Sequence, residues 1–191
     1  MIKTAIAAAL FCAAGSIASA VTQDFESFSE LDVITGLEIG GFSLSAGGDD
    51  IMVANGGNYF GTGNFIQTVP FDNLNPYRAD FSVAGVSMVS VDIGDNNGDA
   101  DDLYLFAFDA ADNPLAFDSV SILDTYIGFK TLTVSAANIS YVLFGGTGLD
   151  GNNNLYADNF SYETAQVPLP AGGILLLTAL LGLGAAKRRK S

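Results

Sequence analysis

The side chains best suited to chemistry lie in one acidic stretch, residues 95–102. Oxygen-bearing side chains occur there at every second position, which is the D-x-N-x-D-x-D spacing of calcium-binding loops. The match to an EF-hand fails at Ala100, where that loop has glycine, and at Phe106, where it has glutamate. The stretch therefore predicts either an irregular calcium site or a solvated hairpin tip rich in turn-forming residues. Its candidate metal ligands are Asp95, Asn97, Asp99 and Asp101.

Few of the side chains that enzymes use at neutral pH are present. The sequence has no histidine and no tryptophan, and its one cysteine, Cys12, lies in the apolar N-terminal run. A serine nucleophile would lack its usual base, and the chain after Cys12 cannot form disulfides, thiolate nucleophiles or cysteine–metal sites. A pair of carboxylates could still act as in glycosidases, although no spacing selects one pair. We therefore expect a protein that is not an enzyme, with a carboxylate-based carbohydrate-active enzyme as the alternative.

The charge of the chain is distributed unevenly. All 21 acidic residues lie between residues 21 and 166, where Arg78 and Lys130 are the two bases, so this segment has a formal charge of −19. Such a segment repels the phosphates of nucleic acids and attracts divalent cations. We expect no nucleic-acid partner.

The N-terminal residues have the pattern of a secretion signal. Lys3 supplies a positive start, and residues 4–14 are almost purely apolar. Ala18, Ser19 and Ala20 then form the A-x-A pattern that signal peptidase cleaves. The sequence predicts a signal peptide over residues 1–20, removed by cleavage after Ala20.

The C-terminal end has the pattern of a single membrane span. Residues 171–186 are 16 uncharged residues rich in leucine, and residues 187–190 are all basic. As a helix this run would be about 24 Å long, slightly short of the hydrocarbon core of a bilayer. Basic residues remain on the cytoplasmic side, so residues 21–166 are expected outside the membrane.

A short motif precedes this span: Val167, Pro168, Leu169, Pro170 and Ala171. Together with the span and the basic end, it resembles the sorting signals of the PEP-CTERM family, in the variant known as VPLPA-CTERM. The resemblance covers residues 167–191. It implies recognition and cleavage near the motif by an exosortase-type enzyme, and a cell-surface or matrix location in a Gram-negative bacterium that makes exopolysaccharide or biofilm. A plain membrane anchor fits the span and its basic flank equally well.

The middle segment, residues 21–166, has the pattern of an all-β domain. Short apolar runs alternate with Gly, Asn and Asp clusters, and no helical period is present. Residues 103–108 are apolar at every position, which predicts a central strand, and residues 112–114 predict a hairpin turn. The many short strands favour a jelly-roll-like β-sandwich. The expected strands are 21–28, 39–45, 50–54, 64–69, 78–83, 86–93, 103–109, 115–121, 127–134, 138–145 and 155–163.

The order of the later strands, ending in Asp158, Asn159 and Phe160, resembles jelly-roll domains that are similar to carbohydrate-binding modules. The resemblance implies a structural Ca²⁺ held between the first and last strands. Asp158 would be its ligand from the last strand, and Asp24 and Glu26 would be its ligands from the first, since alternation puts both carboxylates on one face. Alternatively, Asp158 caps a turn through backbone hydrogen bonds.

The middle segment is also rich in aromatic residues, which either fill a core or bind sugar rings. We expect an exported surface or matrix protein that binds extracellular polysaccharide through a calcium-stabilised sandwich. A structural or adhesive protein without a sugar site is the alternative. The aromatic residues considered for glycan contact are Tyr59, Phe60, Phe65, Phe71, Tyr77 and Tyr126.

Overall fold

The computed structural model describes one domain within residues 20–165, apart from four short internal segments. The described residues are 20–57, 63–70, 75–96, 100–148 and 155–165. All regular structure in them is β-strand, and no helix long and apolar enough to cross a membrane occurs among them. Most of the expected signal peptide, including Ala18, lies outside these residues, as do the sorting motif and the predicted span.

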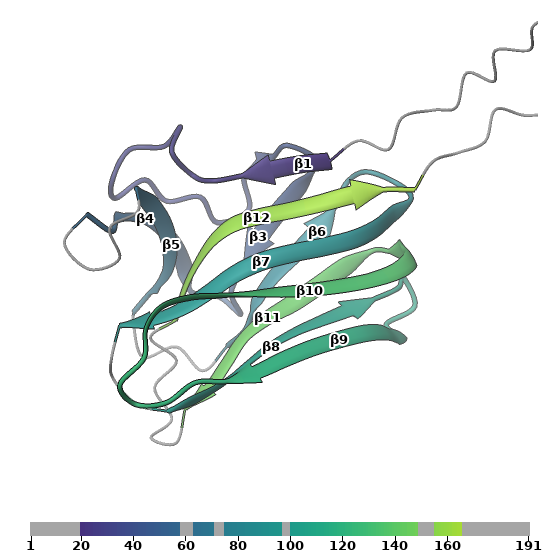
Figure 1. Ribbon diagram of the computed structural model, residues 1–191. Coiled ribbons are helices and arrows are strands. Elements are labelled where there is room, and N and C mark those ends of the chain that lie inside the picture. The colour runs from purple at the N-terminus through teal and green to yellow at the C-terminus, as the bar shows by residue number, and fades with distance from the viewer. Residues whose placement is uncertain (1–19, 58–62, 71–74, 97–99, 149–154, 166–191) are drawn as a thin grey trace, which may run out of the picture. The chain divides into compact units, whose positions relative to one another are not determined.

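The first sheet holds six strands in the order β10-β7-β12-β5-β4, with β1 also paired to β12 (Figure 1). All of its pairings are antiparallel. Its first strand pairs with its last strand so that Ala20 lies opposite Glu163, which places the two ends of the domain side by side. The strands are β1 (Ala20–Gln23), β4 (Asp50–Asn55), β5 (Asn64–Val69), β7 (Val86–Asn96), β10 (Ile127–Ile139) and β12 (Tyr156–Thr164).

The second sheet also holds six antiparallel strands, in the order β2-β3-β6-β11-β8-β9 (Figure 1). The strands are β2 (Glu38–Ile39), β3 (Phe42–Ser45), β6 (Tyr77–Phe81), β8 (Asp101–Phe108), β9 (Pro114–Ser121) and β11 (Tyr141–Gly148). The expected all-β sandwich is therefore confirmed.

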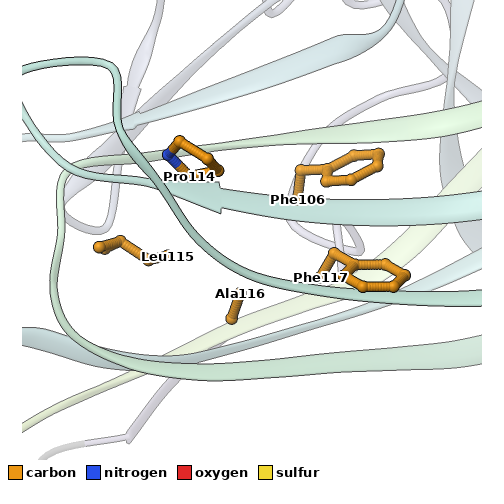
Figure 2. A pocket seen from close by; sticks show the side chains of 5 residues that line it. All are labelled: Phe106, Pro114, Leu115, Ala116 and Phe117. Atoms are coloured by element: carbon orange, nitrogen blue, oxygen red, sulfur yellow. The ribbon is translucent and has the colours of Figure 1, made fainter.

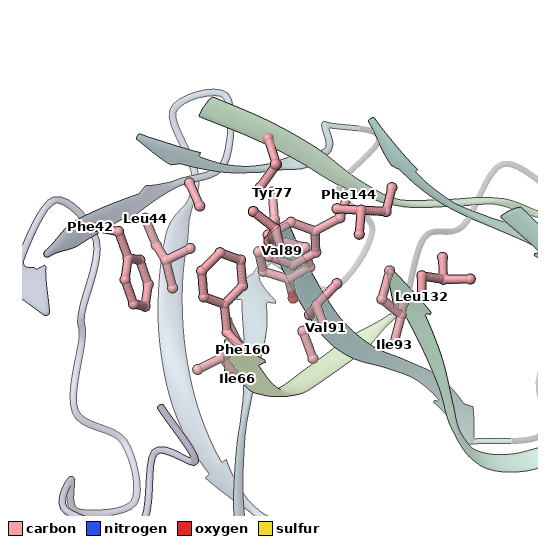
Figure 3. Packing of buried hydrophobic residues seen from close by; sticks show 14 of the residues in the cluster. Phe42, Leu44, Ile66, Tyr77, Val89, Val91, Ile93, Leu132, Phe144 and Phe160 are labelled. Carbon is pink, nitrogen blue, oxygen red and sulfur yellow. The ribbon is translucent and has the colours of Figure 1, made fainter. Parts of the chain in front are cut away.

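The core lies between the inner faces of the two sheets. Phe160 from the first sheet is 1% exposed, and its ring lies 4.5 Å from that of Phe42 and 5.8 Å from that of Phe144, both in the second sheet (Figure 3). Leu103 and Leu105 of β8 are fully buried from the same side. The strand period of two explains this packing in strands such as β8, where every second side chain enters the core.

Two expected strands are shortened or divided, and others differ from those observed at their ends. For example, β10 extends to Ile139, so the strand expected over 138–145 begins at Tyr141. The strand expected over 21–28 ends at Gln23, because Phe25 has a φ of 58° and turns the chain while its ring enters the core. The strand expected over 39–45 is divided by Gly40 and Gly41, whose φ angles are 58° and 98°. Only glycine adopts such angles without strain, so these two residues make the turn between β2 and β3.

The predicted hairpin turn joins β8 to β9. Oδ1 of Asp109 accepts hydrogen bonds from the backbone N–H groups of Ala111 and Asn113, at 2.8 and 2.9 Å. The side-chain amide of Asn113 also donates to Oδ2 of Asp109 at 2.9 Å. This side-chain bond is the largest cause that lowers the pKa of Asp109, and the two backbone bonds lower it further. Asp112 has a φ of 62°, which Asp tolerates better than most residues. The turn therefore fixes the register of β8 against β9.

Candidate functional site

The outer face of the second sheet carries a group of aromatic side chains. On β8 the even-numbered residues Tyr104, Phe106 and Phe108 point away from the core and are half-buried. Phe117 of β9 lies opposite Phe106, and Tyr141 of β11 lies opposite Phe108. We call these five residues the aromatic face. It explains why β8 is apolar at nearly every position, although only one side of the strand is in the core.

The rings of the aromatic face contact one another across three neighbouring strands. Phe106 and Phe117 are stacked with their centroids 5.7 Å apart, and Phe108 and Tyr141 are stacked at 4.8 Å. Tyr104 lies 5.5 Å from Phe106 along β8. The outermost ring is that of Phe117, which is 67% exposed. Tyr141 is 7% exposed, so the accessible part of the face is made by Phe117 and the half-buried rings of β8.

A shallow hollow lies beside Phe117, with a volume of about 230 Å³. Its lining is apolar, and Figure 2 shows the rings of Phe106 and Phe117 lying together at one end of it. The lining residues are Phe106, Pro114, Leu115, Ala116 and Phe117. A hollow of this size fits one small ring of a ligand rather than a whole polymer.

Arg78 covers the inner end of the aromatic face. Its guanidinium carbon lies 3.6 Å from the centroid of the Tyr141 ring, which is therefore enclosed between Arg78 and Phe108. Nε and one terminal nitrogen of Arg78 donate to the two carboxylate oxygens of Asp80 at 2.8 and 2.7 Å. The Tyr141 hydroxyl donates to Asp112 at 3.0 Å. These contacts fix the Tyr141 ring and leave it little freedom to reorient.

Where β7 lies between β10 and β12, the outer face of the first sheet is polar instead. The hydroxyls of Ser90 and Thr133 lie 3.1 Å apart, and the Thr131 hydroxyl and the Asn159 amide both donate to Asp92. Short hydroxyl and carboxylate side chains are the usual composition of a solvated sheet face. The aromatic face of the second sheet therefore differs from this polar region.

The side chains predicted to hold Ca²⁺ between the chain ends lie near enough to influence one another electrostatically. Asp158 is 4% exposed and lies opposite Asp92 on β7. Burial is the main cause that raises the pKa of Asp158, and the charges of Asp92, Glu26 and Asp24 raise it further, to about 6. We call these four residues the carboxylate cluster.

Two details of this prediction are corrected. Asp24 and Glu26 lie in the turn after β1 rather than on a strand, and they are both exposed. Oδ1 of Asp158 accepts the backbone N–H of Asn159 at 2.7 Å, which is the turn-capping role considered as the alternative. Among the described residues, no three acidic side chains are arranged to hold a metal ion. Oε1 of Glu26 accepts the backbone N–H of Asn64 at 2.6 Å, and Oδ1 of Asp24 accepts that of Glu26 at 3.2 Å.

The acidic stretch 95–102 is not wholly a solvated hairpin tip, because two of its carboxylates are buried. Asp95 and Asp101 are the last inward residue of β7 and the first of β8, and each is 3% exposed. Both strands are longer than expected, so these carboxylates lie inside the sandwich. Asn97 and Asp99 lie outside the described residues.

The aromatic residues considered for glycan contact are not those of the aromatic face. Tyr77 is buried, and its hydroxyl donates to the carbonyl of Leu155. Phe65 is buried against Tyr156, and the hydroxyl of Tyr126 donates to a backbone carbonyl. Tyr59, Phe60 and Phe71 lie outside the described residues. In the sequence, the aromatic face is visible only as an aromatic residue at every second position of 103–108, together with Phe117.

No family model and no curated protein matches this chain. Among solved structures it is similar to an arabinose-bound GH51 α-L-arabinofuranosidase, with a TM-score of 0.51 and 13% identity over 75% of this chain, which spans 26% of that enzyme. A DUF4465 family protein from Bacteroides caccae gives a TM-score of 0.46, with 10% identity over 77% of this chain and 100% of that one. The CBM22-1 xylan-binding domain from Paenibacillus barcinonensis gives 0.42, with 15% identity over 73% and 99%. At 13% identity, the similarity to the first of these structures supports the fold alone.

Proposed function

We propose that this chain is an exported surface or matrix protein that binds a glycan through its aromatic face, and that it is not an enzyme. The aromatic face is the observation that carries the proposal. Sugar rings present apolar C–H surfaces that pack on aromatic rings, and a contiguous exposed apolar surface generally marks an interaction site. The most exposed ring, Phe117, stands beside the hollow that would receive one sugar.

Replacing Phe117 with alanine is expected to weaken glycan binding at least about tenfold, because a stacked ring is typically the main contact of such a site. The measurement is calorimetric titration with oligosaccharides first selected by screening an array with the wild-type domain. Leu123→Ala is the matched control, because Leu123 is 71% exposed outside the aromatic face and the hollow. Equal binding by wild type and Phe117→Ala would remove the aromatic face from the proposal.

The proposed location rests on the two ends of the chain. A signal peptidase site at Ala18–Ala20 and the VPLPA motif at residues 167–171 would place the domain outside the inner membrane, to be released by an exosortase-type enzyme to the surface or matrix. Mass spectrometry of protein from cells and medium is expected to show a mature start at Val21 and a C-terminus near the motif. A chain with both ends uncut, found in the cytosol, would contradict this location.

We further propose that Ca²⁺ stabilises the domain at the carboxylate cluster. Carboxylate oxygens are the ligands that Ca²⁺ prefers, and the repulsion among these groups would be relieved by a cation. Millimolar Ca²⁺ is therefore expected to raise the melting temperature of the wild type but not of Asp158→Asn. The same titration with Mg²⁺ is the control, because Mg²⁺ demands a strict octahedral arrangement of ligands and gives up its waters less readily than Ca²⁺. No rise in the wild type would dispose of the site.

A second candidate function, adhesion to another protein, is favoured by an apolar edge of the first sheet. Residues 31–34 run beside β4, where the Leu31 N–H donates to Val53 and Val33 pairs with Met52. Leu31 and Val33 are nevertheless 66% and 51% exposed. Such an edge can pair with a strand of another chain. This function would survive Phe117→Ala, which separates it from glycan binding.

A further inference from the structure

We infer that the aromatic face selects glycans by charge, binding those with protonated amino groups more tightly than neutral ones and excluding those with carboxylates. The inference rests on the proposed function and assigns its ligand class. Its evidence is the placement of the charged side chains around the aromatic face.

The bases of the domain are both committed to other contacts. Residues 21–166 contain two, Arg78 and Lys130. Arg78 makes a two-point ion pair with Asp80, and its flat side is occupied by the ring of Tyr141. Lys130 belongs to the other sheet, where its ammonium group lies 4.6 Å from the centroid of the Tyr126 ring. An anionic sugar on the aromatic face would therefore meet one base, Arg78, whose charge is balanced by its ion pair with Asp80.

Carboxylates stand at both ends of the row of rings instead. Asp102 begins the outward side of β8 and is exposed, followed by Tyr104, Phe106 and Phe108. Beyond Phe108, the exposed carboxylate of Asp112 accepts the hydroxyl of Tyr141. With a rise of about 3.4 Å per residue, the row from Asp102 to Phe108 is about 20 Å long. A sugar chain lying along β8 would thus have a carboxylate near each end.

The rings themselves also favour a cation. The face of an aromatic ring carries negative potential, so an ammonium group close to the exposed ring of Phe117 is attracted to it. Each exposed contact between an ammonium group and Asp102 or Asp112 changes affinity by roughly twofold to fivefold. The formal charge of −19 adds a longer-range attraction that salt weakens.

The test compares three oligosaccharides of equal length by calorimetric titration: β-1,4-linked glucosamine, its fully N-acetylated form, and a β-1,4-linked uronic acid. At mildly acidic pH and low salt, the glucosamine oligomer is expected to bind about tenfold more tightly than the N-acetylated one, with no measurable binding of the uronate. High salt should reduce the difference in affinity between the glucosamine and N-acetylated oligomers. Equal affinities for the amino and N-acetylated oligomers, or tighter binding of the uronate, would overturn the inference.

Variants distinguish the effect of the carboxylates beside the aromatic face from the effect of the net charge of the domain. The double variant Asp102→Asn, Asp112→Asn is expected to reduce the tenfold preference to about threefold or less. Glu30→Gln, Asp124→Asn removes the same charge at exposed sites elsewhere and should preserve the preference. An equal reduction by both variants would show a bulk charge effect and overturn the inference. A glucosamine affinity unchanged by Phe117→Ala would instead refute the proposed function itself.

Discussion

Replacing Phe160 with alanine is expected to lower the free energy of unfolding by about 3–5 kcal/mol. The Phe160 ring is 1% exposed and joins the two sheets through ring contacts with Phe42, Phe144 and Phe81, at centroid distances of 4.5, 5.8 and 6.2 Å. Removing it leaves a cavity that residues from both sheets surround and that backbone hydrogen bonding prevents from collapsing fully. Equilibrium unfolding in urea measures the effect.

The matched control for this change is Phe117→Ala, which removes the same ring from the aromatic face. We expect it to cost about 1 kcal/mol or less, because a ring that is 67% exposed gains little from folding. If the two variants lost similar stability, Phe160 would not be at the centre of the core, and the arrangement of the two sheets would be wrong.

Replacing Asp158 with asparagine is expected to stabilise the domain at neutral pH by about 1–3 kcal/mol when Ca²⁺ has been removed. The pKa of Asp158 is raised from 3.8 to about 6 in the folded protein, first by burial and then by Asp92, Glu26 and Asp24. Above pH 6 the carboxyl is charged in both states, so folding bears the full cost of burying that charge. Asparagine has nearly the same shape and carries no charge.

The pH dependence of this stabilisation follows from the same pKa. Between pH 6 and pH 3.8 the folded state binds a proton that the unfolded state does not, so the wild type gains stability as the pH falls. The advantage of Asp158→Asn should therefore shrink through this range. Asp124→Asn, which neutralises an exposed carboxylate, is the control for net charge. Urea unfolding at several pH values in the presence of a chelator measures the stability of both variants. If the stability gained by Asp158→Asn did not change with pH, a buried charge on Asp158 would not be its cause.

Alternation predicted β9, where every second side chain faces inward, and the expected strand 115–121 differs from it by one residue. The expected strand 64–69 coincides with β5, which is buried at five consecutive positions, so turn residues at its ends rather than alternation marked it. Local turn chemistry also sufficed at residues 112–114. The expected strand 21–28 was too long because Phe25 adopts a left-handed backbone angle that ends the strand. Phenylalanine rarely adopts such an angle, so the sequence does not predict it.

The site was less predictable, because it depends on which strands become neighbours. Residues 103–108 are apolar on both sides, and sequence alone cannot distinguish a strand buried twice from one with an aromatic outer face. Pairing of β8 with β9 and β11 is what adds Phe117 and Tyr141 to that face. Asp95 and Asp101 look like residues of a solvated turn, and their burial follows from the length of β7 and β8.

The most direct test of glycan binding is to map the bound face by NMR. The chemical shifts of the backbone amides would be recorded for the domain while an oligosaccharide selected by array screening is added. Binding at the aromatic face predicts that the largest changes fall in β8, β9 and β11, around Phe106, Phe117 and Tyr141, with little change at Ser90 or Thr133 on the opposite outer face. Changes centred on the polar face of β7 and β10, or a bound sugar that shifts no amide of β8 or β9, would contradict the account.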